Sequence, residues 1–251
     1  MPVRRRLIAG NWKMNCTAME TERFLGQFDV EMGKAELLIC MPFTDLYLAE
    51  KYLAGTGVKW GAQNVYPAEK GAFTGEISPG MLKETGCSYV ICGHSERRRI
   101  LYESDAFVGQ KVKVVLDHGM TPILCVGETL EERDRGQMKA RLLEEMKAAL
   151  LDLSGEELLR TVIAYEPVWA IGTGKAATAQ DAETVSAFIR KTVEAFSSGE
   201  VAERIRILYG GSVTEENISS FLREKDVDGA LIGGASLKAE ELLSIYKKAC
   251  E

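Results

Sequence analysis

Short apolar runs alternate with longer amphipathic stretches along the whole chain. Eight of these runs have the length and continuous apolar character of strands that are buried on both faces. They lie at residues 6–10, 37–41, 58–62, 89–92, 122–126, 162–165, 205–209 and 229–232. The length of 251 residues gives about 31 residues per run, which is the size of one strand–helix unit. The pattern therefore predicts an α/β fold with eight strands.

The stretches between the runs carry start signals and apolar stripes that are typical of helices. Apolar side chains recur there every three or four residues, as in residues 107–116 and 138–150. Three pairs match a capping box, in which a threonine and an acidic residue bond each other's backbone N–H groups: Thr17 with Glu20, Thr129 with Glu132, and Thr178 with Asp181. Thr214 is a further candidate cap.

Eight strands that alternate with helices require a mostly parallel sheet. Such a sheet either closes into a (β/α)8 TIM barrel or stays open as a doubly wound sheet. No linker, composition shift or repeat divides the chain. We therefore expect a single (β/α)8 barrel domain over residues 1–251.

The stretch after the sixth predicted strand is unusual for a surface loop. The strand ends on Glu166, and Pro167 then lacks the N–H that a strand ladder needs. Trp169 and Ile171 are apolar, where a solvated loop would be polar. Apolar residues between a proline and glycines predict a lid over residues 167–177, beside a catalytic base.

Function in a barrel gathers at the carboxyl ends of the strands. Lys13 follows the first predicted strand, so its ammonium either points into the barrel mouth or lies in solvent. His94 follows the fourth strand at the start of a short predicted helix, and it is either catalytic or a buried structural histidine. The positive end of the helix favours the neutral imidazole ring.

Paired glycines follow the last two predicted strands, each just before a predicted helix. Gly210 and Gly211 precede Ser212, and Gly233 and Gly234 follow the eighth strand. Glycines before a helix let backbone N–H groups approach an anion closely. In barrels a phosphate site often forms from these two loops, so the two pairs together predict a phosphate ligand.

The connection from residue 63 to residue 78 is too long for an ordinary turn. Its Val65, Tyr66 and Phe73 argue against disorder, and we interpret it as a subunit contact. His118 precedes a glycine at a predicted helix end and is interpreted as a structural cap. Cys125 has neither a cation nor a helix start beside it in the sequence and is interpreted as structural.

Composition narrows the function classes. The net charge of −6 argues against nucleic acid or an anionic membrane as the main partner. The six cysteines form no C-x-x-C pair and there are only two histidines, so we predict no metal site. Buried thiols in a reducing cytoplasm are expected. The amino-terminal apolar stretch is too short for a signal peptide, and no run approaches transmembrane length.

Five motifs, in order along the chain, resemble the triosephosphate isomerase family. They are residues 11–15, 93–98, 164–174, 209–213 and 233–236. The resemblance implies interconversion of dihydroxyacetone phosphate and glyceraldehyde 3-phosphate, in glycolysis and gluconeogenesis. It implies neither a metal nor a redox cofactor, because the reaction moves a proton between adjacent carbons.

The resemblance also assigns roles to individual residues. Glu166 matches the base, and His94 matches the electrophile that polarises the carbonyl oxygen. Asn11 and Lys13 match residues that bind substrate and stabilise the enediolate. Gly172, Ser212, Gly233 and Gly234 match the residues that bind the phosphate. Ser95 matches the residue that holds the base while the lid is open, and Glu96 matches a supporting acid.

Family members are usually homodimers, with the long third loop docked into the neighbour near its first loop. Thr74 matches the residue at the tip of that loop. Cys16 follows the first motif where glycine or lysine is more usual, and we expect it near the same interface. Two alternatives stay open: another phosphate-binding barrel enzyme, a lyase or epimerase for a larger sugar phosphate, and a catalytically silent barrel that serves as a scaffold.

Overall fold

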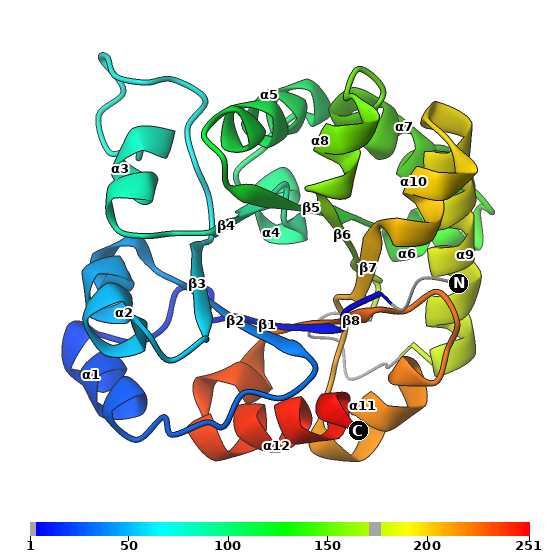
Figure 1. The fold of residues 1–251 in the computed structure, drawn as a ribbon. Helices are drawn as coiled ribbons and strands as arrows, with labels where there is room; N and C mark the ends of the chain where they lie inside the picture. The colour runs from blue at the N-terminus through cyan, green and yellow to red at the C-terminus, as the bar shows by residue number, and fades with distance from the viewer. Residues whose placement is uncertain (1–3, 171–176) are drawn as a thin grey trace.

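The computed structural model describes residues 4–170 and 177–251. Eight parallel strands close into a barrel, each paired with its neighbours in sequence order and β1 paired with β8 (Figure 1). The open-sheet alternative is therefore excluded, and the (β/α)8 barrel is confirmed. The strands are β1 Leu7–Asn11, β2 Glu36–Met41, β3 Lys59–Ala62, β4 Tyr89–Cys92, β5 Thr121–Val126, β6 Val162–Tyr165, β7 Arg206–Tyr209 and β8 Gly229–Ile232.

All eight predicted strands are present, and several of their ends differ from the prediction by one residue. β1 begins at Leu7 rather than at residue 6 and includes Asn11, whose backbone pairs with Cys40. β3 and β7 begin one residue later than predicted, at Lys59 and Arg206. The differences arise because backbone pairing with the neighbouring strands decides where a strand begins and ends, whereas the apolar run in the sequence reflects burial.

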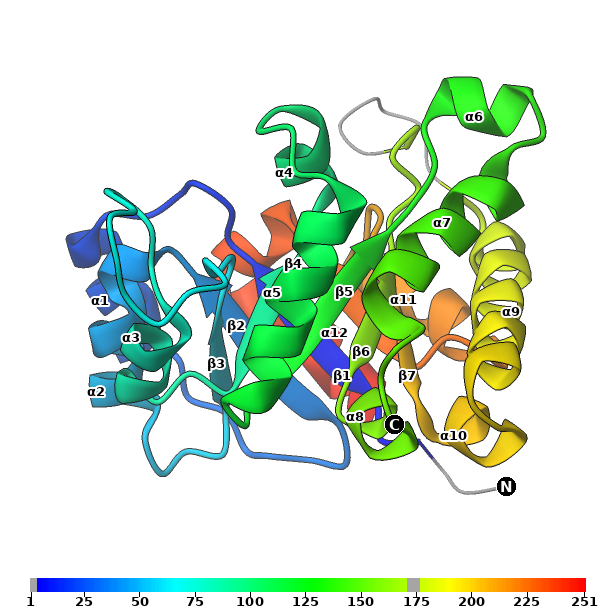
Figure 2. The same cartoon turned by 90° about the horizontal axis from the view of Figure 1, so that it is seen from above.

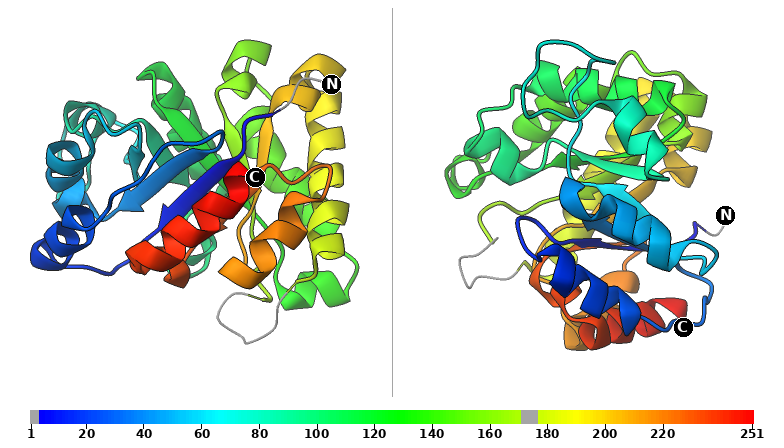
Figure 3. Two further views of the ribbon diagram at one scale, coloured as in Figure 1. Left: turned by 60° about the horizontal axis from the view of Figure 1, so that its bottom comes forward. Right: turned by 90° about the vertical axis from the view of Figure 1, so that its left-hand side faces the viewer.

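Helices surround the barrel on its outer side (Figure 1). They are α1 Ala18–Gly26, α2 Leu46–Leu53, α3 Pro79–Glu84, α4 Ser95–Arg99, α5 Asp105–Asp117, α6 Leu130–Asp134, α7 Met138–Leu150, α8 Gly155–Leu159, α9 Ala179–Phe196, α10 Gly199–Arg204, α11 Glu215–Leu222 and α12 Ala239–Cys250, with 3₁₀ turns η1 Phe43–Asp45 and η2 Gly234–Leu237. Figure 3 shows α12 alongside β1, where Arg6 donates to the Ala249 carbonyl at 3.0 Å.

The predicted capping signals operate in the structure. Thr17, Thr129 and Thr178 each form a capping box at the start of α1, α6 and α9. Thr214 precedes α11, and its backbone N–H donates to the Asn217 side chain at 2.8 Å. These bonds satisfy N–H groups that have no partner within the helix, so each helix start is fixed locally.

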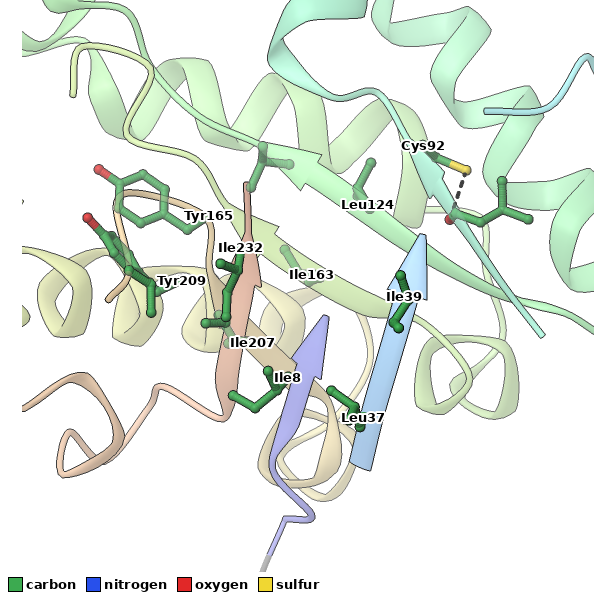
Figure 4. Close-up of a cluster of buried hydrophobic side chains, with 14 of the residues drawn as sticks. Ile8, Leu37, Ile39, Cys92, Leu124, Ile163, Tyr165, Ile207, Tyr209 and Ile232 are labelled. Carbon is green, nitrogen blue, oxygen red and sulfur yellow. Dashed lines mark hydrogen bonds between the residues drawn. The ribbon is translucent and has the colours of Figure 1, made fainter. Parts of the chain in front are cut away.

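Alternate residues of the strands build two cores. One set points outward against the helices, and Figure 4 shows part of it, including Ile8, Ile39, Leu124, Ile163 and Ile207. The other set fills the barrel interior: Leu7, Ala9, Leu38, Cys40, Tyr89, Ile91, Ile123, Cys125, Val162, Ala164, Leu208 and Leu231. Both faces of the strands are thus buried, which explains why their sequences are continuously apolar.

Loops of very different length follow the strands. The connection between β3 and α3 spans residues 63–78 and projects beside α3 (Figure 1). α4 and α6 follow β4 and β5 closely and stand over the carboxyl end of the barrel (Figure 2). Within the described ranges, no helix is both long and apolar enough to cross a membrane.

Candidate active site

A cavity of about 380 Å³ opens at the carboxyl end of the barrel. Its walls come from loops that are far apart in sequence, because parallel strands bring all their carboxyl ends to one edge. Among the predicted site residues its lining includes Asn11, Lys13, His94, Glu166, Ser212, Gly233 and Gly234. Ser95 and Glu96 contact this set directly, through Glu166 and Lys13.

The loop after β1 holds Lys13 in the cavity wall. Trp12 is fully buried, and its indole N–H donates to the Ser236 carbonyl at 3.0 Å. The Asn11 side chain accepts from the Lys13 backbone N–H at 3.0 Å, and Lys13 has a φ of 54°. A left-handed backbone is uncommon for lysine and occurs where surrounding contacts impose it. The Lys13 ammonium donates to Glu96 Oε1 at 2.6 Å.

His94 occupies the cap position of α4, as its sequence position predicted. The Glu96 backbone N–H donates to Nδ1 of the ring at 3.3 Å. A nitrogen that accepts carries no proton, so this bond places a proton on Nε2. Nε2 lies 2.9 Å from Glu166 Oε1. The imidazole N–H therefore points at the carboxylate and into the cavity.

Glu166 is 2% exposed and lies directly after β6. Its carboxylate accepts from the Ser95 backbone N–H at 2.9 Å and from the Ser95 hydroxyl at 3.3 Å. Two glycines enclose it: a Cβ on Gly127 would lie 1.8 Å from the Glu166 carbonyl oxygen, and one on Gly210 would lie 3.0 Å from Glu166 Cγ. The base candidate thus sits in a slot that side chains on either side would close.

Burial alone raises the pKa of Glu166, but His94 and the Ser95 N–H outweigh it and hold the pKa below its ordinary value. Burial also lowers the pKa of His94, and the Glu166 carboxylate more than offsets this, so that the pKa of His94 is raised. The neutral ring that we predict for catalysis therefore belongs to a state in which Glu166 has turned away from His94. In that state burial and the helix start both favour the neutral form.

The far wall of the cavity consists of the loops after β7 and β8. Ser212 precedes the start of α11, and Gly233 and Gly234 lead into η2. A Cβ on Gly234 would meet no atom of residues 4–170 or 177–251 within 4 Å, so none of the described residues fills the space on this side of the backbone. Accessible backbone N–H groups at two neighbouring helix starts can bind a phosphate.

Comparison with known proteins points to one family. The triosephosphate isomerase family model matches residues 6–249. A triosephosphate isomerase of Dictyoglomus thermophilum is 47% identical over 249 residues, covering 98% of this chain and all of that protein. Those of Caldanaerobacter subterraneus and Fusobacterium nucleatum are 49% and 48% identical over 245 and 248 residues, covering 97% and 98% of this chain and 99% of each relative.

The chain belongs to the triosephosphate isomerase family. As a member of this family it is an isomerase that interconverts an aldose and a ketose phosphate. The resemblance drawn from five motifs is thereby confirmed. The geometry above comes from the chain itself, and it adds the arrangement of side chains on which a mechanism can be argued.

The leading end of the predicted lid is anchored to the loop after β5. The Trp169 indole N–H donates to Glu128 Oε1 at 2.9 Å, and the Arg133 guanidinium lies 4.4 Å from the centre of the Trp169 ring. Arg133 also bonds Asp181, which caps α9 beyond the trailing end. Ile171, Gly172 and Lys175 lie outside the described residues, so the predicted lid tip and phosphate contact stay predictions.

Glu128 and Gly127 were missed by the sequence reasoning, and Gly210 was identified only as part of the phosphate loop, not as a neighbour of Glu166. Glu128 is fully buried and accepts from Trp169, Tyr165 and Arg133 through one oxygen. Gly127 and Gly210 form the slot described above. The available signal was a glycine or an acid directly after a buried strand, the same signal that drew attention to Glu166 itself.

The two residues interpreted as structural have structural surroundings. His118 is the C-cap of α5, with Nδ1 2.8 Å from the Val114 carbonyl oxygen. Cys125 is buried in the barrel interior, and burial together with the Glu166 carboxylate raises the pKa of its thiol. A thiol that stays protonated is a poor nucleophile. All six cysteines are free, and four are buried.

Thr74 lies exposed on the loop of residues 63–78 and takes no part in the cavity of its own chain. A neighbouring hollow of about 340 Å³ lies on the other side of Lys13, with Met14, Gln63, Glu96 and Leu101 in its lining. Met14 is 97% exposed and Tyr102 is 87% exposed. Apolar surface of this kind often marks a protein–protein contact.

Proposed function

We propose that this enzyme interconverts dihydroxyacetone phosphate and glyceraldehyde 3-phosphate by proton transfer through an enediolate. The observation that carries the proposal is the pairing of Glu166 with His94 Nε2 at 2.9 Å, beside Lys13 and opposite two glycine loops. A carboxylate, an imidazole N–H and a cation then face one small cavity. These are the groups that a proton transfer next to a carbonyl requires.

In the proposed reaction the phosphate binds at Ser212, Gly233 and Gly234. Glu166 removes a proton from the carbon next to the carbonyl and returns it to the neighbouring carbon. His94 donates from Nε2 to the carbonyl oxygen. Lys13 and Asn11 stabilise the negative charge of the enediolate, because fixed donors act on developing charge without reorganising.

Movement of Glu166 from Ser95 to the substrate makes it a better base. In the described arrangement His94 and the Ser95 N–H hold the pKa of Glu166 low. A carboxylate that leaves these donors keeps its burial, and burial raises the pKa. The Ser95 contact is therefore interpreted as the position of the base while the site is open, and Glu96 as the acid that holds Lys13.

We further propose that residues 167–177 close over the substrate, with Gly172 as a phosphate donor. Closure excludes water, and an enediolate left in contact with water would expel its phosphate. Trp169 on Glu128 and the capped start of α9 support this by fixing both sides of the segment. The Glu128 contact gives the leading side a defined position from which it can move.

The exposed apolar surface near Lys13 supports a homodimer. We propose that Thr74 of one copy enters the partner's hollow beside Met14 and Glu96. Cys16, which is half-buried with a φ of 71°, lies in the same loop as Met14, between β1 and α1. Sedimentation should give the mass of a dimer, and Thr74→Arg should shift it toward the monomer; a monomeric wild type would exclude this part.

The free cysteines support the cytoplasm as the compartment.

The deciding experiment is a coupled assay of isomerisation from glyceraldehyde 3-phosphate. Removing the base through Glu166→Gln should lower kcat on the order of 10²–10⁴-fold, because general base catalysis supplies that much. Glu144→Gln is the matched control, since Glu144 lies on the surface of α7. No isomerisation by the wild type, or an undiminished rate in Glu166→Gln, would refute the proposal.

A further inference from the structure

A second group of charged residues lies behind Glu166, on the side away from the phosphate loops. Glu145 of α7 bonds Arg141 at 2.9 Å and lies 3.5 Å from Arg98 Nε of α4. Both arginines also bond Asp105 at the start of α5. The Glu145 side chain is 1% exposed and that of Arg98 is 9% exposed. We call these four residues the back cluster.

The back cluster holds the ends of β4 and β5. Arg98 donates to the Gly93 carbonyl at 2.7 Å and to the Cys125 carbonyl at 3.2 Å. Glu145 Oε2 accepts from the Gly127 backbone N–H at 2.8 Å. Gly93 directly precedes His94, so one ion pair touches the backbone beside both proposed catalytic groups.

Gly127 passes this restraint to Glu166. There is no room for a side chain between them, as a Cβ on Gly127 would lie 1.8 Å from the Glu166 carbonyl oxygen. The Glu166 N–H also bonds the adjacent Val126 carbonyl at 2.8 Å. Gly127 has no side chain of its own to anchor it in the core, so its bond to Glu145 is what fixes the slot from behind.

Stability alone is a poor reason to keep such a cluster. Burial raises the pKa of Glu145 to about 7, although Arg98 and Arg141 act against this. Buried ion pairs often stabilise a fold no more than apolar residues of the same size would. A role in fixing one arrangement of the strand ends accounts for the burial of these charges better than a role in folding.

We propose that Glu145 and Arg98 are positioning residues that set the place of Glu166 relative to His94. Neither lines the cavity with the phosphate loops, so both act through the backbone of Gly127 and Gly93. The proposal rests on Glu166 acting as the base. A shift of about 1 Å in a reacting group can lower a rate by about 10²-fold.

The test compares variants that each remove one carboxylate partner of Arg141. Glu145→Met loses both the charge and the acceptor for Gly127, and kcat should fall about 10–100-fold with KM little changed, because the phosphate loops are untouched. Glu145→Gln keeps an acceptor and should recover much of the loss. Glu144→Gln removes a surface carboxylate that pairs with Arg141 and touches neither Arg98 nor the strand ends, so its kcat should equal that of wild type.

A second readout separates positioning from folding. Glu166→Asp draws the carboxylate back by one methylene, so a residue that acts through Glu166 should give non-additive losses when the two changes are combined. If Glu145→Met does not fold, Arg98→Lys with Glu166→Asp still provides this cycle, because one ammonium cannot keep both backbone bonds of Arg98. Additive losses, or a kcat for Glu145→Met equal to that of Glu144→Gln, would overturn the proposal. A fully active Glu166→Gln would instead overturn the proposed base.

Discussion

Both ends of the barrel bury charged residues, and the two ends use them differently. At the amino end Arg190 bonds Asp226 at 2.6 Å and Asp228 at 2.9 Å, and its other N–H groups donate to the carbonyls of Ala202 and Ile205. Arg4 bonds Asp228 as well. Each donor of the Arg190 guanidinium is directed at a neighbour within the protein. This end of the barrel is closed by a satisfied network.

At the carboxyl end the charged groups face a cavity. Glu166 contacts His94, and Lys13 contacts Glu96, yet Glu166, His94 and Lys13 all also line the cavity. Glu166 is held by Ser95 and His94, and we propose that it exchanges these contacts for substrate. Burial of charge therefore does not by itself mark a functional site. A buried charge that borders a cavity of substrate size does.

The largest expected effect separates the two ends by stability. Arg190→Met leaves Asp226 and Asp228 buried without their partner, and we expect unfolding to become easier by about 3–5 kcal/mol. Urea denaturation measures this, and the activity per folded molecule should stay that of wild type. A stable variant with low activity would reverse the interpretation of this end.

Removing a cation from the other end should have the opposite outcome. Lys13→Met loses a donor to developing negative charge, so kcat/KM should fall about 10²–10³-fold. Its ion pair with Glu96 is partly exposed, so the melting temperature should change little. Steady-state kinetics and calorimetry on the same preparation check both statements. An active but unstable Lys13→Met would mean that this cation is structural too.

The Glu166–His94 pair predicts a window of pH. The pKa of Glu166 is lowered from 4.5, so its stabilisation is present above that value and lost as pH falls through the lowered pKa. The pKa of His94 is raised from 6.5, so its stabilisation is present below 6.5 and lost as pH rises through the raised pKa. The stability difference between wild type and His94→Gln should therefore be largest between these two values.

Glu96 and Lys13 also face His94, one raising and one lowering its pKa. Denaturation of Glu96→Gln across the same pH range controls for the effect of Glu96 on His94. A stability difference that does not depend on pH would show that the two groups do not interact as an ion pair.

The smallest effect comes from two capping boxes at opposite ends. Thr178→Ala at the start of α9 and Ser154→Ala at the start of α8 each remove a cap worth about 0.5–2 kcal/mol. Both should lower stability by similar amounts. Only Thr178→Ala should raise the share of substrate that loses phosphate, because Thr178 borders the lid. Equal product ratios in the two variants would show that the cap of α9 has no part in the proposed lid closure.

Local rules account for much of what could be predicted. The strands were found because both faces are buried, and the helix starts because a threonine and an acid three residues later satisfy orphan N–H groups. Glu166, His94 and Lys13 were found because each lies within two residues of the end of a buried strand. The back cluster was not found, because Arg98 and Asp105 lie far from Glu145 in sequence and all three look like solvated charges on helices.

The sequence by itself determined the eight strand–helix units, the family and the residues at the strand ends, since these depend on local patterns of burial and on short motifs. Only the tertiary structure decided what those residues touch. Closure of the barrel brings Ser95 to Glu166, Glu96 to Lys13 and Glu145 to Gly127. Such contacts depend on strand register and on positions where there is no room for a side chain. No local sequence pattern encodes either of these. The slot between Gly127 and Gly210 is the clearest case.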